Sequence, residues 1–435
     1  MRRSPSPRRR TPGACCGAPS AATRRAPAGR ATAAGPGRRL APAPGEGGEG
    51  RPCQGHASCV PICPSQAKYT PLRTQARWGP SVRLVTRAVV TRVLIDPAGR
   101  ATGVRYRRYA EGPEAAPDPA EYTAGAELVV LAAHAIETAR LLLVSGAAGG
   151  SGQVGRNLMD HPVLLTWGLM PRPVGPYRGP GSTAGLEAFR FGAARARRAP
   201  FRVEFGNWGW TWPLGPPDGR VAELLRTGGP DGRGLFGPGL RAAVGDRIGR
   251  EFSLQFELEQ DADPSNRVTL DPSRRDRFGT PRPVLHYDLS DWVRRGAAAA
   301  RSVSEQVFAL LGAEDHTRFD PGPAWPGYFA FEGRGYAYRA AGHGAGTHLM
   351  GASPATSVVD PWQRCWDHPN LYAVGCGSMP SISTANPSLT MAALALRSCD
   401  RIHRDLLALH RPAAVRDAVP AVPGRPARTE GAERP

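Results

Sequence analysis

Three cysteines close together in the sequence form the first group of residues able to do chemistry. Cys53, Cys59 and Cys63 are separated by five and three residues, and Pro64 follows the last of them. Clustering of this kind in a long chain favours a metal or redox site over a disulfide framework. The run resembles iron–sulfur ligand runs, although its spacing differs from that of ferredoxins. Zinc would need a fourth ligand, for which His56 is the nearest candidate, and inert thiols are the third interpretation.

Two side chains nearer the C-terminus form a second group. His343 begins a His-Gly-Ala-Gly-Thr stretch, and Asn386 and Pro387 suit the N-cap and first-turn positions of a helix. An imidazole, with an unperturbed pKa of about 6.5, can accept a proton at neutral pH, whereas an amide can only hydrogen-bond an oxygen. On the residues alone, a structural histidine and a plain helix cap compete with catalytic roles. His161 and His348 are more typical of structural positions.

The elements that must position these residues include two strand–helix units. Glu127–Ala133 is a continuous apolar run, and a helical pattern follows it directly over Ala135–Leu143. Leu371–Gly375 is a short apolar run of the same kind, and Pro387–Leu409 has the pattern of a long helix. A buried strand, a tight turn and a helix in that order indicate a doubly wound α/β sheet.

Other segments indicate antiparallel structure. Arg83–Asp96 is rich in β-branched residues, and a Pro-Ala-Gly turn joins it to Gly103–Tyr109, which predicts a hairpin. Glu251–Gln260 alternates in polarity, and Arg267–Leu270 and Val284–Leu289 are short strand candidates. We therefore expect an antiparallel sheet that forms a second domain, inserted where the chain leaves the α/β domain.

The predicted organisation has two terminal segments and three parts between them. The terminal segments contain mainly Pro, Ala, Gly and Arg, so they cannot bury enough apolar surface to offset their ordering entropy. The predicted parts are a disordered leader over 1–50, α/β domain over 51–165, antiparallel domain over 166–340, α/β domain again over 341–410, and a disordered tail over 411–435.

Composition excludes several classes of protein. The net charge of +19 comes almost entirely from arginine, since Lys68 is the only lysine, and much of it lies in the leader. No basic stripe interleaved with aromatic residues appears, so we predict no nucleic-acid partner. No run of 18 apolar residues exists, which predicts no membrane-spanning helix. The basic N-terminus lacks a following apolar region, so it does not have the pattern of a secretory signal.

A series of motifs carries a resemblance to a known family. The motifs are His343–Thr347, Met350-Gly351, Ser357–Asp360, Asn370–Gly375 and Asn386-Pro387-x-x-Thr390, with Val129–Ser145, Val154–Pro162, Asn266–Asp271 and Phe278-Gly279 upstream. Their order and spacing are similar to those of the GMC (glucose-methanol-choline) oxidoreductases. The resemblance covers roughly residues 53–409 and implies the α/β class, with an incomplete Rossmann-like FAD-binding domain and an inserted antiparallel-sheet substrate domain.

The resemblance implies a function and a set of site residues. It implies oxidation of a CH–OH group, in which hydride passes to the flavin, His343 accepts the hydroxyl proton and Asn386 binds the substrate oxygen. The positive end of the helix that follows Asn386 would lie beside the flavin edge that becomes negative on reduction. The residues expected to contact FAD are Val90, Gly375, Cys376, Ser378, Asn386, Pro387 and Thr390.

The cysteine-rich stretch refines the resemblance. A run that ends in Cys-Pro-x-x-Ala-x-Tyr, from Cys63 to Tyr69, is similar to that of flavoprotein subunits of bacterial sugar and polyol dehydrogenases. This branch implies a [3Fe–4S] cluster at Cys53, Cys59 and Cys63 that passes electrons to an acceptor other than oxygen. It also implies a cytochrome and a small escort subunit as partners, and a periplasmic or membrane-associated location; a complete chain as given would be cytoplasmic.

One expected part of such a protein is missing from the sequence. A GMC protein is expected to begin with a strand and a GxGxxG turn, whose amides hold the FAD pyrophosphate. Gly45–Gly50 contains glycines, but no strand precedes it, so we reject it as that turn. We expect a truncation or a frame error upstream of Cys53. The alternative functions are a truncated, catalytically inactive GMC-like fragment and an iron–sulfur or zinc-binding module.

Overall fold

The computed structural model places most of the chain after residue 50. The residues it describes are 31–33, 51–55, 59, 63–112, 116–176, 178–207, 224–229 and 231–410. The predicted leader and tail lie outside the described residues, except for Ala31–Ala33, which form strand β1. No helix among the described residues is long and apolar enough to cross a membrane.

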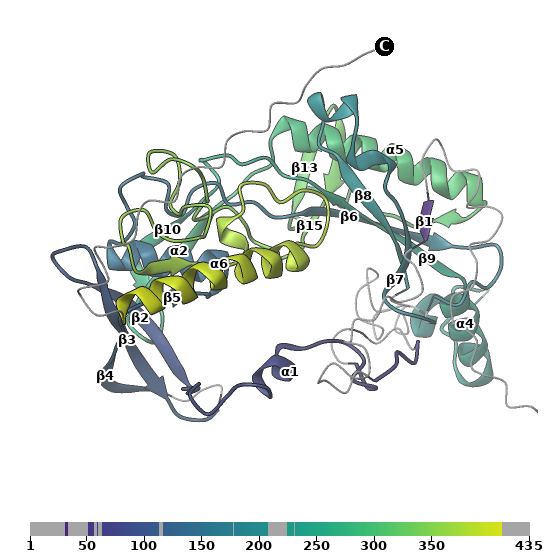
Figure 1. The fold of residues 1–435 in the computed structure, drawn as a ribbon. Coiled ribbons are helices and arrows are strands. Elements are labelled where there is room, and N and C mark those ends of the chain that lie inside the picture. Colours follow the sequence, from purple (N-terminus) through teal and green to yellow (C-terminus); the bar gives the residue numbers. More distant parts are fainter. Residues whose placement is uncertain are drawn as a thin grey trace, which may run out of the picture.

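The α/β part contains one parallel strand pair with a helix after each strand (Figure 1). β5 (Val129–Leu131) pairs with β16 (Leu371–Ala373), and helices α2 (His134–Ser145) and α6 (Ser388–Leu409) follow them. Both strands are apolar; β16 is buried throughout, whereas in β5 Val129 and Leu131 are buried and Val130 between them is exposed. The predicted α/β class and its two strand–helix units are confirmed.

A three-stranded antiparallel sheet lies beside this pair. Its strands β2 (Ala88–Ile95), β3 (Ala101–Tyr109) and β4 (Pro117–Gly125) are consecutive in the chain, after the short helix α1 (Pro71–Gln75). The hairpin between β2 and β3 is confirmed, although β2 begins later than Arg83. β4 was not predicted, because its two prolines and acidic residues do not have the pattern of a strand.

The larger antiparallel sheet forms the second part of the molecule. Its strand order is β1-β7-β8-β9-β6-β12, and β15 also pairs with β6. The bounds are β6 Pro162–Leu169, β7 Ser182–Leu186, β8 Phe201–Gly206, β9 Glu251–Leu258, β12 Glu314–Asp315 and β15 Arg339–Ala340. The sheet confirms the predicted antiparallel structure, with β9 at the alternating segment. The predicted boundaries at 165 and 340 stay predictions.

Two hairpins, two helices and three short 3-10 helices complete the described elements. The hairpins are β10 (Arg267–Arg275) with β11 (Pro281–His286), and β13 (Tyr328–Phe331) with β14 (Arg334–Ala337). The helices are α4 (Gly237–Arg250) and α5 (Asp291–Leu311), and the 3-10 helices are η2 (Ala188–Arg190), η3 (Ala193–Ala196) and η4 (Cys376–Ser378). β10 and β11 coincide with the strand candidates around residues 267 and 284.

The large sheet has one apolar and one polar face. Phe201 and Val203 of β8 and Phe256 of β9 are buried in one cluster with the apolar residues of α5, which covers this face (Figure 1). Since side chains alternate along a strand, the neighbouring residues Arg202 and Glu257, which are paired across the two strands, lie on the other face. This second face is polar yet buried, so its charges must be satisfied within the protein.

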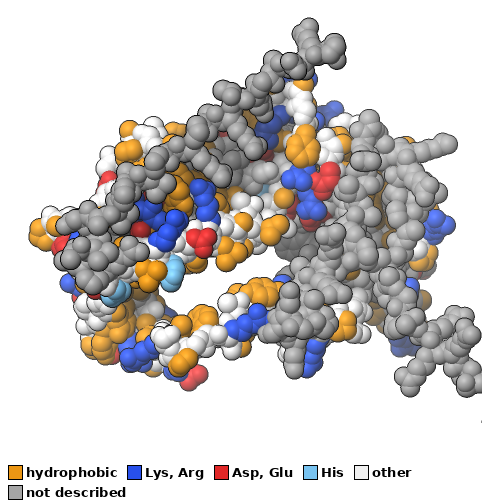
Figure 2. Space-filling model, in the orientation of Figure 1, with side chains coloured by type: hydrophobic (Ala, Val, Ile, Leu, Met, Phe, Trp, Pro, Cys, Tyr) orange, Lys and Arg blue, Asp and Glu red, His pale blue; other side chains and the backbone are white. Residues whose placement is uncertain are grey.

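Helix α6 is the most exposed long element of the α/β part. Its Leu389, Leu396 and Leu407 are 84%, 70% and 51% exposed, whereas Ser398 is buried. Figure 2 shows hydrophobic and basic side chains interspersed over the face where α6 lies, with an opening between α6 and the segment that carries α1. Helix α6 therefore packs against the rest of the protein along one narrow side, which contains Ser398.

Glu257 makes the stability of the fold depend on pH. Gln255 donates to one oxygen of its carboxylate at 2.9 Å, and the other oxygen has no partner in the described structure. Burial, with the nearby Glu204, raises its pKa from 4.5 to about 7, and Arg202 opposes the shift. An acid whose pKa is raised by folding loses stability as the pH rises from its unfolded pKa through its folded pKa.

We therefore predict that Glu257→Gln stabilises the protein at pH 8 but not at pH 4.5. The shift corresponds to a gain of up to about 3 kcal/mol in unfolding free energy at the higher pH. Urea denaturation at the two pH values measures it. Glu305→Gln, on the exposed side of α5, is the control and should change neither value. An equal gain at both pH values would contradict the assignment to ionisation.

Candidate active site

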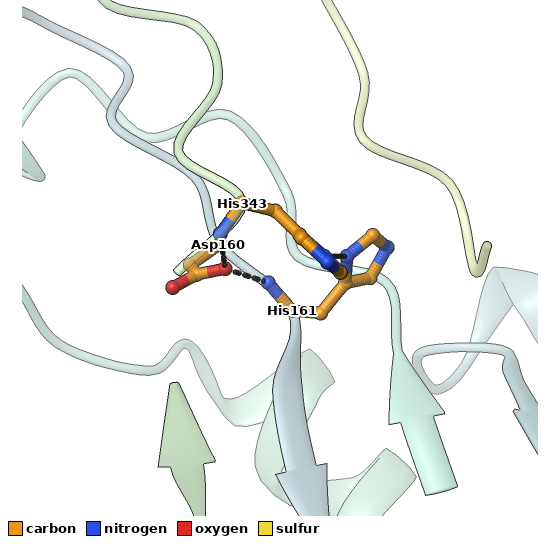
Figure 3. Close-up of side chains that lie close together, drawn as sticks. All are labelled: Asp160, His161 and His343. Atoms are coloured by element: carbon orange, nitrogen blue, oxygen red, sulfur yellow. Dashed lines mark hydrogen bonds between the residues drawn. The ribbon is translucent and has the colours of Figure 1, made fainter. Parts of the chain in front are cut away.

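Two histidines that are far apart in the sequence meet at the start of β6. The Nδ1 atoms of His161 and His343 lie 2.7 Å apart, and the two rings are nearly perpendicular at 86° (Figure 3). The other ring nitrogen of His161, Nε2, lies 3.0 Å from the carbonyl oxygen of Ser383. His161 is fully buried and His343 is half-buried. The structure thus brings together one histidine predicted to be catalytic and one predicted to be structural.

A single carboxylate holds the backbone of both histidines. Asp160 Oδ1 accepts hydrogen bonds from the backbone N–H of His161 at 2.7 Å and of His343 at 2.9 Å. Its Oδ2 accepts from the backbone N–H of Gly342 at 2.9 Å. Hydrogen bonds to an ionised group are stronger than neutral ones. Asp160 therefore fixes the segment that enters β6 against the segment that carries His343 (Figure 3).

The glycines after His343 are required by close packing. Backbone hydrogen bonds in both directions join Ala345 to Met159, at 3.0 and 2.8 Å. Gly346 has a φ of +87°, and a Cβ there would lie 1.9 Å from the carbonyl oxygen of Asn157. Only glycine fits at such a position. The glycine-rich pattern thus lets the loop of His343 lie flat on the strand that leads to Asp160.

Both imidazoles are held in the neutral form. Burial, followed by the neighbouring His343, lowers the pKa of His161 from 6.5 to about 4. Burial also lowers the pKa of His343, and the negative charge of Asp160 partly offsets the shift. At neutral pH each ring carries one N–H and one bare nitrogen. The short contact between the two Nδ1 atoms is therefore a hydrogen bond between a donor and an acceptor.

The same group has the composition of a metal site but not its geometry. Ligand atoms of Asp160, His161 and His343 lie within 4.8 Å of one another. Two nitrogens bound to one tetrahedral zinc at about 2.0–2.1 Å would lie roughly 3.3 Å apart, farther than the observed Nδ1–Nδ1 distance. Both oxygens of Asp160 already accept backbone hydrogen bonds. The arrangement fits a shared proton better than a shared ion.

The loop before α6 is held by side chains of the antiparallel domain. Arg190 Nε donates to Thr384 Oγ1 at 2.8 Å, and Ser381 Oγ donates to Glu259 Oε1 at 3.1 Å. Between these contacts, Ser383 has a φ of +58° and presents its carbonyl to His161. Three contacts from the other domain therefore position the segment that leads to Asn386. Sequence reasoning missed Arg190 and Glu259, for which no local pattern exists.

The predicted cap of α6 is wrong by one residue. Pro387 occupies the N-cap position, with φ and ψ in the helical region, and no side chain caps the helix. Asn386 is exposed and its side chain makes no hydrogen bond to the described residues. The side chain of proline cannot accept a hydrogen bond, so the first N–H groups of α6 have no side-chain acceptor. The amide of Asn386 is therefore available for another partner.

The other residues predicted to contact the cofactor lie at the ends of β16 and α6. Gly375 has a φ of +98° and leads into η4, which contains Cys376 and Ser378. Thr390 is exposed in the first turn of α6 and Pro387 is buried before it, while Val90 on β2 packs against the core beneath β5 and β16. The positions other than Val90 thus lie in the segment that follows the carboxyl end of β16, and α/β proteins bind ligands at this end of their parallel strands.

A buried hydrogen-bond chain attaches α6 to this end of the sheet. Ser398 Oγ donates to Gln363 Oε1 at 2.7 Å, and Gln363 Nε2 donates to Ser378 Oγ at 2.6 Å. Ser378 Oγ donates in turn to the carbonyl of Gly375 at 2.9 Å. This chain explains why Ser398 is the buried residue of an otherwise exposed helix.

His348 packs beneath the same loop. It is fully buried, burial lowers its pKa to about 4, and its backbone N–H donates to the carbonyl of Gly377 at 2.9 Å. A Cβ at Gly377 would lie 2.1 Å from the imidazole carbon Cε1 of His348, so a side chain at that position is excluded. The contacts of His348 are those of a packed structural residue.

The cysteine cluster is only partly defined. Cys53 is exposed, and Cys59 and Cys63 are half-buried, with no disulfide among them. Their three sulfur atoms do not meet the 4.8 Å spacing of a single-ion site, and His56 lies outside the described residues. A hydrogen bond with Ser65, followed by one with the backbone of Lys68, holds the pKa of the Cys63 thiol below its usual value. The iron–sulfur cluster stays a prediction.

Two bacterial dehydrogenase proteins are similar in sequence to the chain. It is 30% identical over 368 residues to the fructose dehydrogenase large subunit of Gluconobacter japonicus, a match that covers 82% of this chain and 61% of that protein. It is 26% identical to the gluconate 2-dehydrogenase flavoprotein of Pantoea cypripedii, over 82% of this chain and 55% of that protein. The chain thus spans little more than half the length of these relatives.

Solved structures and family models were also compared. A formate oxidase of Aspergillus oryzae matches with a TM-score of 0.48 and 16% identity, over 74% of this chain and 61% of that one. The N-terminal model of the GMC oxidoreductases matches residues 34–163, and the C-terminal model matches residues 262–395. Asp160 and His161 lie within the first match, and His343 and Asn386 lie within the second. Since the two matches together span well over half of the chain, it belongs to the GMC oxidoreductase family.

Proposed function

We propose that this protein is an FAD-dependent dehydrogenase that oxidises a CH–OH group of a sugar or polyol. The observation that carries the proposal is the pair of neutral imidazoles, His161 and His343, at the junction of the two domains. Their loops share a buried apolar cluster with η4, because Met159 and Ala345 pack against Cys376. A base next to the carboxyl end of the parallel strands is well placed to act on a substrate bound there.

The described residues fit one end of a flavin. A Cβ at Gly375 would meet no atom within 4 Å, so there is open space beside η4. The first N–H groups of α6 have no side-chain cap, and this positive helix end suits a ring edge that becomes negative on reduction. The GxGxxG pattern at Gly150–Gly155 follows helix α2 and precedes strand β6, so it is not the strand–turn–helix unit that would hold the pyrophosphate. FAD, when bound, would supply the acceptor for the hydride.

Two side chains of the protein would accept the proton and bind the substrate. His343, which is neutral and half-buried, accepts the proton of the substrate hydroxyl while hydride leaves the same carbon, and the alcohol becomes a carbonyl. Asn386, exposed and without an intramolecular partner, donates a hydrogen bond to the substrate oxygen. Asp160 keeps the loop of His343 in place through its backbone.

A polyhydroxylated substrate is favoured by the polar face of the large sheet. Alternation along β6 places His161 on the same face as Val163, which pairs with Glu257 on β9. Arg202, Glu204 and Glu257 thus line the face that leads away from the histidines. Arg202 and Glu204, whose side chains keep some exposure, can pair with sugar hydroxyls, which both donate and accept hydrogen bonds. Relatives named for fructose and gluconate are consistent with this substrate class.

The path of the electrons is part of the proposal. We propose that a [3Fe–4S] cluster at Cys53, Cys59 and Cys63 receives them from the flavin and passes them to an acceptor other than oxygen. Support comes from the lowered pKa of Cys63, because thiolates are the ligands of such clusters. A relative named as a large subunit favours a further subunit as partner, with a cytochrome as the electron acceptor.

We predict that His343→Asn lowers kcat by about 10²–10⁴-fold, because the base is lost while its size is nearly kept. Dye reduction with fructose, gluconate and a set of polyols, on protein saturated with FAD, measures the effect. His286→Asn removes an exposed histidine that contacts only Thr269 and serves as the matched control. Unchanged turnover in His343→Asn would remove this residue from the mechanism.

The pH dependence of kcat/KM provides a second test. Burial lowers the pKa of His343 below its usual value of 6.5, so the imidazole is unprotonated at neutral pH. We expect kcat/KM to decline on acidification with a midpoint below pH 6.5, where the imidazole takes up a proton. A midpoint above pH 7 would contradict a buried imidazole as the base.

Iron content tests the proposed cluster. We expect protein purified without oxygen to contain iron and a broad visible absorption, and Cys63→Ala to lose both. Cys399→Ala, which removes an exposed thiol on α6, should change neither. Iron-free protein after anaerobic reconstitution with iron and sulfide would refute the cluster and leave the alcohol oxidation untouched.

A further inference from the structure

We propose that His161 is a positioning residue that fixes the tautomer of His343, so that Nε2 of His343 is the nitrogen that accepts the substrate proton. The inference rests on the proposed function, since it specifies which atom of His343 acts as the base. It starts from the chain of contacts Ser383–His161–His343, in which each group limits the next.

The first step is set by a carbonyl group. The oxygen of Ser383 can only accept a hydrogen bond, so Nε2 of His161, 3.0 Å away, must carry a hydrogen. His161 is fully buried, and its environment keeps it neutral. A neutral imidazole has one N–H, so Nδ1 of His161 is bare and can only accept. The tautomer of His161 is therefore determined by the backbone.

The second step transfers this restriction to His343. The two Nδ1 atoms lie 2.7 Å apart, and a contact this short between nitrogens requires a hydrogen between them. Since Nδ1 of His161 can only accept, Nδ1 of His343 must be the donor. His343 is neutral as well, so its Nε2 has no hydrogen. This nitrogen is the one free to remove a proton from a hydroxyl group.

The surrounding structure holds the first link in place. Ser383 has a left-handed backbone, which non-glycine residues rarely adopt unless their neighbours impose it. The contacts of Ser381 with Glu259 and of Thr384 with Arg190 lie on either side of it. The carbonyl of Ser383 thus points to His161 because the loop is held at both ends by the antiparallel domain.

The arrangement also determines where the abstracted proton stays. When Nε2 of His343 takes the hydroxyl proton, His343 becomes an imidazolium whose Nδ1–H already donates to His161. His161 could accept that second proton and remain neutral only if it released its own Nε2–H. The partner of that N–H is a carbonyl, which does not take up a proton at accessible pH. His343 therefore retains the proton, stabilised by the acceptor nitrogen of His161 and the nearby carboxylate of Asp160.

Two substitutions of His161 separate the tautomer from packing. In His161→Gln, the side-chain oxygen can accept from Nδ1 of His343 and the amide N–H can donate to Ser383, so both links are kept. In His161→Leu, both links are lost at similar volume. We expect His161→Leu to lower kcat on the order of 10²-fold or more, and His161→Gln to recover most of the loss. The pH at which kcat/KM declines should differ from the wild-type value in His161→Leu and should return to it in His161→Gln.

Nitrogen-15 NMR of the histidine side chains in the full chain gives a readout that needs no turnover. His343→Asn identifies the signals of His343. We expect wild-type and His161→Gln protein to show Nδ1 of His343 protonated and Nε2 bare, and His161→Leu to shift His343 toward the Nε2–H form that free imidazole prefers. Wild-type protein with a hydrogen on Nε2 of His343 would overturn the inference, even if His161→Leu fails to fold.

The two proposals fail in different ways. If the tautomers are as expected but His343→Asn remains active, the proposed function is wrong and the positioning by His161 stands as a structural fact. If His343→Asn is inactive but His161→Leu keeps full activity and the Nδ1–H tautomer, the positioning role is wrong and the function stands. Thermal unfolding of each variant shows whether a loss of activity reflects a loss of folded protein.

Discussion

The candidate site depends on one carboxylate that binds backbone rather than side chains. Asp160 accepts hydrogen bonds from three N–H groups, and the two segments that it joins are 182 residues apart in sequence. The segment of His161 leads into the antiparallel sheet, whereas that of His343 leads into the α/β part. The backbones of the two histidines are therefore held together by Asp160, independently of any contact between the imidazole rings. A charge-assisted contact suits this role, because its loss would leave three donors without a partner.

Steric limits account for most of the conspicuous sequence pattern around the site. Gly346 and Gly377 are positions where a Cβ would lie within about 2 Å of a neighbouring atom, and Gly375 requires a positive φ. These glycines let their loops pack directly against Asn157 and His348, so the side chains in these loops are held close to neighbouring segments. The glycine-rich pattern thus reflects close packing of the backbone. His343 is recognisable in the sequence because of the glycines that follow it.

The parts of the structure predictable from sequence are those with a local cause. The strands β5 and β16 and the helices after them follow from continuous apolar runs and helical periodicity, and His343 follows from the resemblance. β4 was missed because its prolines and acidic residues are not typical of a strand. It forms because its backbone pairs with that of β3. His161 was interpreted as structural because its significance arises from a ring 182 residues away. No local pattern records such a contact, so only the fold reveals it.

The large antiparallel sheet also fixes the loop before α6. Arg190 and Glu259 come from this part of the molecule and His161 lies directly before its strand β6, and together they hold the loop that leads to Asn386 and α6. Arg190 is bound to Glu187, which also binds Arg202 on the polar face of the sheet. A change in the charges of that face would thus reach the loop through two ion pairs. The charges of the sheet and the position of the loop before α6 are consequently linked in one polar network, and neither can be altered without strain on the other.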